Sequence, residues 1–164
     1  MHARDPQARP EPSRGSPSFR VWPPIALGVP LSAGISLSHL VGEPIGWPGS
    51  RTAVAAVLAG VFACWNGWSL LLFRRHATGL LPGQPTTQLL RRGPFAVSRN
   101  PLYVGLVVLY VAIAVYASSL WALLMLPVGV VALVKGAVEP EEAYLRERFG
   151  TAYEEYCRDV PRWL

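Results

Sequence analysis

The stretch RRGPFAVSRNPLYVG, residues 91–105, is where a basic, polar segment gives way to the longest uncharged run of the chain. Arg99 is the last charged residue before Lys135. A helix that spans a membrane needs about 17 to 25 apolar residues, so the run at 100–134 is long enough for two short spans. The stretch therefore predicts a loop that brings polar groups to the edge of a helical hairpin in a membrane.

Two further uncharged windows, at residues 21–42 and 52–73, each fit one span. Together with the third window they account for a hydrophobic content of 51% and a mean hydropathy of +0.29. The third window divides at Ser118 and Ser119, which we expect to form a tight turn. We therefore predict an all-α integral membrane protein with four transmembrane helices, a cytoplasmic loop and a C-terminal amphipathic helix. The predicted spans are 22–41, 52–73, 101–117 and 119–136.

The net charge of +5 follows a membrane topology and does not require a nucleic-acid partner. Residues 1–20 carry four arginines and two acids, and residues 74–99 carry five arginines and no acid. Because loops rich in Lys and Arg stay in the cytoplasm, we expect both termini and the 74–99 loop to be cytoplasmic. This topology predicts a multi-pass protein of the plasma or inner membrane.

The chain is expected to form one membrane domain, over 21–164. Residues 1–20 are rich in proline and charge and have too little apolar content for a core, so we predict a disordered cytoplasmic arm there. No Cys/His spacing typical of a metal site occurs, and Cys64 and Cys157 are expected to be unpaired thiols.

The C-terminal part is predicted to be helical. The sequence EPEE at 139–142 is typical of a helix start, with proline at the first position and acids where the helix dipole favours them. Apolar residues then recur at spacings of 4, 4, 3 and 4, namely Leu145, Phe149, Tyr153, Tyr156 and Val160. This spacing predicts an amphipathic helix over about 140–158, docked against the cytoplasmic mouth of the bundle or lying in the interface.

The loop at 87–105 and the acid pair Glu141–Glu142 adjoin the two ends of one predicted hairpin, so they are expected to meet on the cytoplasmic side. Basic groups and backbone N–H groups suit the anionic part of a ligand, and a carboxylate suits ribose hydroxyls, an ammonium or a sulfonium. Simpler readings stay open. Acids at a helix N-terminus are commonly dipole partners, and an arginine beside a membrane span, such as Arg99, commonly marks topology.

The order of these motifs resembles the isoprenylcysteine carboxyl methyltransferase family and its phospholipid methyltransferase relatives. The resemblance covers residues 74–164 and rests on GPFAVSRNPLYVG at 93–105, a long apolar run, and EPEEAYLRERFGTAYEEYCRDVPRWL at 139–164. It implies a membrane methyltransferase that uses S-adenosylmethionine on the cytoplasmic side. The implied methyl acceptor is lipid-like or hydrophobic, carries a carboxylate or an amine, and enters between helices.

Carried over by position, the resemblance implies cofactor contacts in the loop, at the start of the third span and on the acid pair. A glycine in this set would allow a close approach of the backbone. The catalytic residues stay unassigned, with Arg99 and Asn100 as candidates. The implied cofactor residues are Thr87, Gln88, Leu89, Leu90, Phe95, Asn100, Pro101, Leu102, Tyr103, Gly105, Glu141 and Glu142.

Two positions depart from the family pattern. Asn100 stands where many members have histidine, and because an amide does not titrate near neutral pH, proton transfer there is not expected. Ala137 stands where the isoprenylcysteine enzymes have the arginine that holds the substrate carboxylate. Lys135 is the nearest cation and the only candidate for binding substrate.

The missing arginine leaves phospholipid N-methylation open as an alternative to carboxyl methylation. A four-helix transporter or a membrane adaptor without enzymatic activity is a third possibility. Transport usually requires an ionisable residue within the membrane, and the three uncharged windows hold no formally charged residue, with His39 near an edge. The retained motifs argue against an adaptor.

Overall fold

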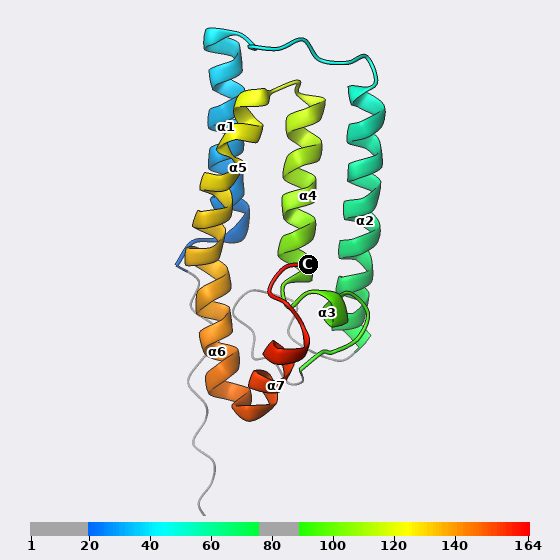
Figure 1. Cartoon of the computed structure of the whole chain (residues 1–164), viewed down its shortest axis with the longest axis vertical. Coiled ribbons are helices and arrows are strands. Elements are labelled where there is room, and N and C mark those ends of the chain that lie inside the picture. Colours follow the sequence, from blue (N-terminus) through cyan, green and yellow to red (C-terminus); the bar gives the residue numbers. More distant parts are fainter. Residues whose placement is uncertain (1–19, 76–88) are drawn as a thin grey trace, which may run out of the picture.

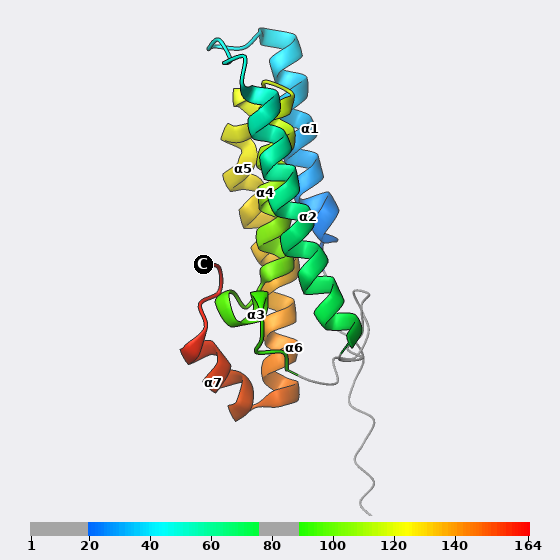
Figure 2. The same ribbon diagram turned by 90° about the vertical axis from the view of Figure 1, so that its right-hand side faces the viewer.

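The computed structural model describes residues 20–75 and 89–164, which are helical with no strand. The long helices α1, α2, α4 and α5 stand side by side (Figure 1). α1 packs along α5 and α2 along α4, and contacts of α4 with α1 and α5 join the two pairs. Figures 1 and 2 place α2 at the edge of the bundle, where its partners among the described helices are α4 and the short α3. The bounds are α1 (Pro23–Val41), α2 (Arg51–Arg75), α3 (Pro94–Val97), α4 (Pro101–Tyr116) and α5 (Leu120–Leu133).

The long helices have the length and composition of membrane spans. Three are long and apolar enough to cross a membrane, namely α1, α2 and the continuous helix Leu120–Phe149, while α4 is apolar but shorter. Large apolar side chains on them, such as Val29, Val57 and Val131, are more than half exposed. So much exposed apolar surface indicates contact with lipid. The described part of the chain is therefore all-helical, as in an integral membrane protein, and each predicted span contains a helix. The number of crossings stays a prediction.

The turn between α4 and α5 lies at the predicted serines. Ser118 has a positive φ of 54°, and the Ser119 hydroxyl accepts the backbone N–H of Ala122 at 3.0 Å. Glu43, from the connector between α1 and α2, accepts the N–H of Leu120 at 2.9 Å. The first N–H groups of a helix have no partner within the helix, and these two side chains supply partners at the start of α5.

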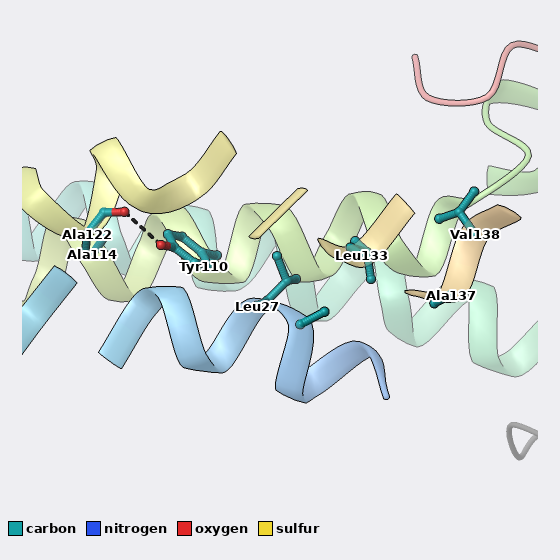
Figure 3. Close-up of a cluster of buried hydrophobic side chains, with 8 residues drawn as sticks. Leu27, Tyr110, Ala114, Ala122, Leu133, Ala137 and Val138 are labelled. Atoms are coloured by element: carbon teal, nitrogen blue, oxygen red, sulfur yellow. Dashed lines mark hydrogen bonds between the residues drawn. The ribbon is translucent and has the colours of Figure 1, made fainter. Parts of the chain in front are cut away.

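A buried apolar cluster joins α1, α4 and α5 (Figure 3). Tyr110 reaches across it from α4, and its hydroxyl donates to the carbonyl oxygen of Ala122 in α5 at 2.8 Å. Small residues let the helices approach closely, as is common in membranes. A Cβ on Gly34 of α1 would lie 2.4 Å from the Cα of Ala122. The cluster consists of Ala26, Leu27, Tyr110, Ala114, Ala122, Leu133, Ala137 and Val138.

As a free start of a helix the prediction at EPEE is wrong, although a helical element does begin at Glu139, with proline in its first positions and acids in its first turn. The chain runs from α5 through a π-helical segment, Val134–Val138, into α6 (Glu139–Phe149) without a break. Pro140 has no N–H to donate to the carbonyl oxygen of Gly136 four residues earlier. That oxygen instead accepts the backbone N–H groups of Arg20 and Val21, at 2.9 and 3.2 Å. The segment before α1 thus supplies the hydrogen bonds that the proline removes, and the helix continues.

The single amphipathic helix predicted over 140–158 is also wrong, because the chain breaks at Gly150 into α6 and α7 (Thr151–Asp159). Gly150 has a φ of +52°, which glycine adopts readily and other residues rarely do. α7 therefore turns away from the axis of α6 (Figure 2). The predicted apolar face persists across the break: Tyr153, Tyr156 and Val160 are buried together, and Leu89, Leu145, Phe149 and Cys157 pack against them.

The close contact of α1 with α5 predicts that Gly34→Ala destabilises the protein by about 1 to 3 kcal/mol, because the new Cβ meets backbone atoms that cannot move aside. The matched control is Gly28→Ala on the same helix, where a Cβ has nothing within 4 Å. Thermal unfolding in detergent should give a lower midpoint for Gly34→Ala than for Gly28→Ala. Equal midpoints would contradict the packing of α1 on α5.

Candidate functional site

The two motifs singled out in the sequence meet at one end of the bundle, where Figures 1 and 2 show α3, the start of α4, α6 and α7 gathered. The hydroxyl of Tyr103, in the first turn of α4, donates to Oε2 of Glu141 at 2.7 Å. Nη1 of Arg99 lies 3.3 Å from Oε1 of Glu142. The predicted proximity of the loop and the acid pair is therefore confirmed.

Glu142 is buried, with 5% of its surface exposed, and both of its oxygens bind arginine. Arg162 contacts it through two hydrogen bonds, from Nε to Oε1 at 3.0 Å and from Nη2 to Oε2 at 2.7 Å. Such two-pronged pairs are among the stronger polar contacts in proteins. The hydrogen bond to Glu142 raises the pKa of Arg162 above its usual value, so the guanidinium stays charged. The cofactor contact predicted for Glu142 stays a prediction, which this pairing does not favour.

The C-terminal tail holds the loop in place. The backbone N–H of Arg99 donates to the carbonyl oxygen of Pro161 at 3.0 Å. The Ser98 hydroxyl and the Asn100 side-chain amide both donate to the carbonyl oxygen of Arg162, each at 3.2 Å. Asn100 is buried, so at the position where many relatives have histidine this chain has a hydrogen-bond donor to its own tail.

Glu141 is in a different situation from its neighbour. Its side chain is half-buried, and among the described residues it accepts a hydrogen bond from Tyr103 and forms no ion pair. The Tyr103 hydroxyl therefore orients the Glu141 carboxyl group, which has no cation partner there, and burial raises the pKa of this group above its usual value. Within the described ranges no group of three His, Cys, Asp or Glu residues could hold a metal ion.

The loop residues predicted to bind the cofactor divide into two groups. Thr87 and Gln88 lie outside the described residues. Leu89 packs on the apolar cluster around Tyr156, and the buried Phe95 accepts the hydroxyl of Tyr156 on its carbonyl oxygen at 2.6 Å. Burial raises the pKa of Tyr156 to about 12, so the hydroxyl stays a donor. α7 thus fixes the conformation of this loop. Leu90, which follows Leu89 in the sequence, is half-buried.

Three predicted residues at the start of α4 contact α2. Nε1 of Trp65 donates to the carbonyl oxygen of Pro101 at 2.8 Å, and Nδ2 of Asn66 lies 3.4 Å from that of Leu102. The amide of Asn66 occupies the space that a Cβ on Gly105 would need. The close approach predicted at Gly105 is therefore made by another helix of the same chain.

Lys135 and Ala137 bear on the predicted acceptor. Nζ of Lys135 lies 2.7 Å from Oε1 of Glu139, and the Lys135 side chain is exposed. Ala137 is fully buried in the main cluster. Position 137 carries no positive charge, because it is an alanine. Lys135, the nearest cation in the sequence, is already paired with Glu139.

Comparison with known protein families decides between the classes that the sequence left open, namely a methyltransferase, a transporter and an adaptor. Residues 50–152 match the family described as phospholipid methyltransferase. The chain belongs to this family. The match confirms the predicted kinship with membrane methyltransferases and covers α2, the loop, Tyr103 and the acid pair, while α1 and Arg162 lie outside it. No curated protein and no solved structure shows a significant match. A membrane methyltransferase is thereby established as the class, whereas the isoprenylcysteine type stays a prediction.

Sequence reasoning missed Arg162, Trp65 and Asn66. Arg162 stands in the quoted motif, but nothing in its spacing connects it with Glu142. Trp65 and Asn66 lie in an apolar span, where a tryptophan is unremarkable. Asn66 could have indicated this contact, because an amide deep in a membrane span needs polar partners.

The pairing of Glu142 predicts that Glu142→Ala destabilises the protein by about 3 kcal/mol, because it leaves the largely buried Arg99 without its carboxylate. Glu147→Ala, an exposed change on the same helix, is the control and should stay within about 0.5 kcal/mol of the parent protein. Chemical unfolding in mild detergent measures both. A similar loss of stability in the two variants would contradict a structural role for Glu142.

Proposed function

We propose that this protein transfers a methyl group from S-adenosylmethionine to the amine of a lipid-like acceptor at the cytoplasmic face of the membrane. The observation that carries the proposal is the Tyr103–Glu141 pair. A carboxylate is held there in a defined orientation without a neutralising cation, at the end of an apolar bundle. Membership of the phospholipid methyltransferase family supports the same reaction class.

The donor set fits the proposed cofactor, which would supply an electrophilic methyl group on a positively charged sulfur. The carboxyl group of Glu141 suits ribose hydroxyls, and a positively charged sulfur beside it would favour its ionised form. Tyr103 keeps the carboxylate in one orientation through its hydrogen bond. Methyl transfer to a neutral amine forms the N–C bond as the S–C bond breaks, and it depends on positioning and on exclusion of water more than on a protein nucleophile. An acceptor that arrives as an ammonium must first lose a proton, to water or to the Glu141 carboxylate.

The charge distribution favours an amine over a carboxylate as the accepting group. A carboxylate acceptor needs a cation, and the ones beside the acid pair are engaged: Arg99 and Arg162 bind Glu142, and Lys135 binds Glu139, so such an acceptor would compete with these carboxylates. The negative charge at Glu141 would repel a carboxylate and attract an ammonium. We therefore place phospholipid N-methylation ahead of carboxyl methylation of a prenylcysteine. The exposed apolar faces of the helices would accommodate the acyl chains of such a lipid.

Cofactor binding should depend on both members of the pair. Hydrogen bonds to charged groups contribute about 1.5 to 3 kcal/mol, so Tyr103→Phe and Glu141→Gln should each weaken S-adenosylmethionine binding roughly 10-fold to 100-fold. Calorimetric titration of the detergent-purified protein measures this. Tyr144→Phe and Glu147→Gln, on the same helix as Glu141, are matched controls expected to leave the affinity unchanged. Equal affinities in all variants would overturn the assignment of the site.

The amine proposal has a chemical test of its own. Incubation with methyl-labelled S-adenosylmethionine and extracted membrane lipid should give a labelled lipid whose label survives mild base, because a methylamine is stable there and a methyl ester is hydrolysed. Mass analysis of the lipid then identifies the methylated headgroup. A base-labile label would instead show carboxyl methylation.

A further inference from the structure

The helix α2 contacts the start of α4 through two adjacent polar side chains. The indole N–H of Trp65 donates to the carbonyl oxygen of Pro101 at 2.8 Å, and the amide of Asn66 reaches the carbonyl oxygen of Leu102 at 3.4 Å. These two carbonyl groups immediately precede Tyr103. Since the described partners of α2 are α4 and α3, this contact joins the edge helix to the turn that carries Tyr103.

Asn66 and Gly105 interlock at the same place. A Cβ on residue 105 would lie 2.0 Å from Oδ1 and 2.6 Å from Cγ of Asn66, so no side chain fits there while the amide stays. Asn66 is 8% exposed, and its Oδ1 has no hydrogen-bond partner among the described residues. An amide confined in this way, in an apolar helix, is held by shape as well as by its one hydrogen bond.

We propose that Trp65 and Asn66 are positioning residues, which hold the first turn of α4 against α2 and thereby set the place of the Tyr103 hydroxyl relative to Glu141. Gly105 is a glycine because Asn66 occupies the space beside it. This inference rests on the proposed function for its effect on cofactor binding. The interlock of Asn66 with Gly105 does not depend on that function.

The interlock is tested by second-site suppression. Gly105→Ala should lower the unfolding temperature in detergent and weaken S-adenosylmethionine binding about tenfold, because the new methyl group collides with Asn66. Asn66→Ala removes the obstacle, so the double variant should return to within about threefold of the affinity of Asn66→Ala alone. Gly60→Ala is the matched control: it lies in α2, has open space around its Cβ, and should change neither quantity.

A double variant that binds more than threefold more weakly than Asn66→Ala alone would overturn the proposal, because it would show that a ligand, and not Asn66, requires the glycine. Trp65→Phe tests the other half. It removes the indole N–H and keeps an aromatic ring, so the affinity should fall about fivefold, with a smaller change in unfolding temperature than Gly105→Ala causes. Unchanged affinity would remove Trp65 from the positioning set.

The two proposals fail in different ways. If the parent protein does not bind S-adenosylmethionine, the proposed function is wrong, and the positioning of Tyr103 for that cofactor is wrong with it. The unfolding temperatures of the single and double variants still decide the interlock. If the parent binds and the double variant shows no rescue of either quantity, the positioning inference fails and the proposed function stands.

Discussion

The buried carboxylate of Glu142 is the contact on which the end of the bundle that carries the candidate site depends. A charge removed from water must be compensated by opposite charge and hydrogen bonds, and here Arg99 and Arg162 provide both. The two arginines come from the loop before α4 and from the C-terminal tail. One side chain on α6 therefore joins three segments that are far apart in the sequence.

Glu141 and Glu142 have different roles because consecutive residues of a helix point in different directions. Successive residues of an α-helix point about 100° apart, so Glu141 and Glu142 cannot face the same partner. Glu142 faces the loop and the tail, and Glu141 faces Tyr103 on α4. The Glu142 carboxylate is compensated by two arginines and is structural, whereas Glu141 has no cation partner among the described residues. That difference makes Glu141 the better candidate for a ligand contact.

The membrane part reaches its packing through small residues and through unusual sources of hydrogen bonds. Gly34 and Gly105 each lie where a Cβ would collide with another helix. At Gly136 the carbonyl oxygen left free by Pro140 is satisfied by backbone N–H groups from the segment before α1. In lipid every backbone polar group needs a partner within the protein. This requirement explains why the segment before α1 crosses the helix at that point.

The sequence by itself determined the four apolar helices, the turn at Ser118 and Ser119, the meeting of the loop with the acid pair, and the family. Each of these follows from local composition, from spacing along one helix or from the order of motifs. Only the tertiary structure decided that the helix continues through Pro140, that it breaks at Gly150, and that Glu142 and Glu141 have separate roles. The physical reason is that burial and partners come from residues distant in the sequence, as Arg162 is from Arg99 and as Asn66 is from Gly105.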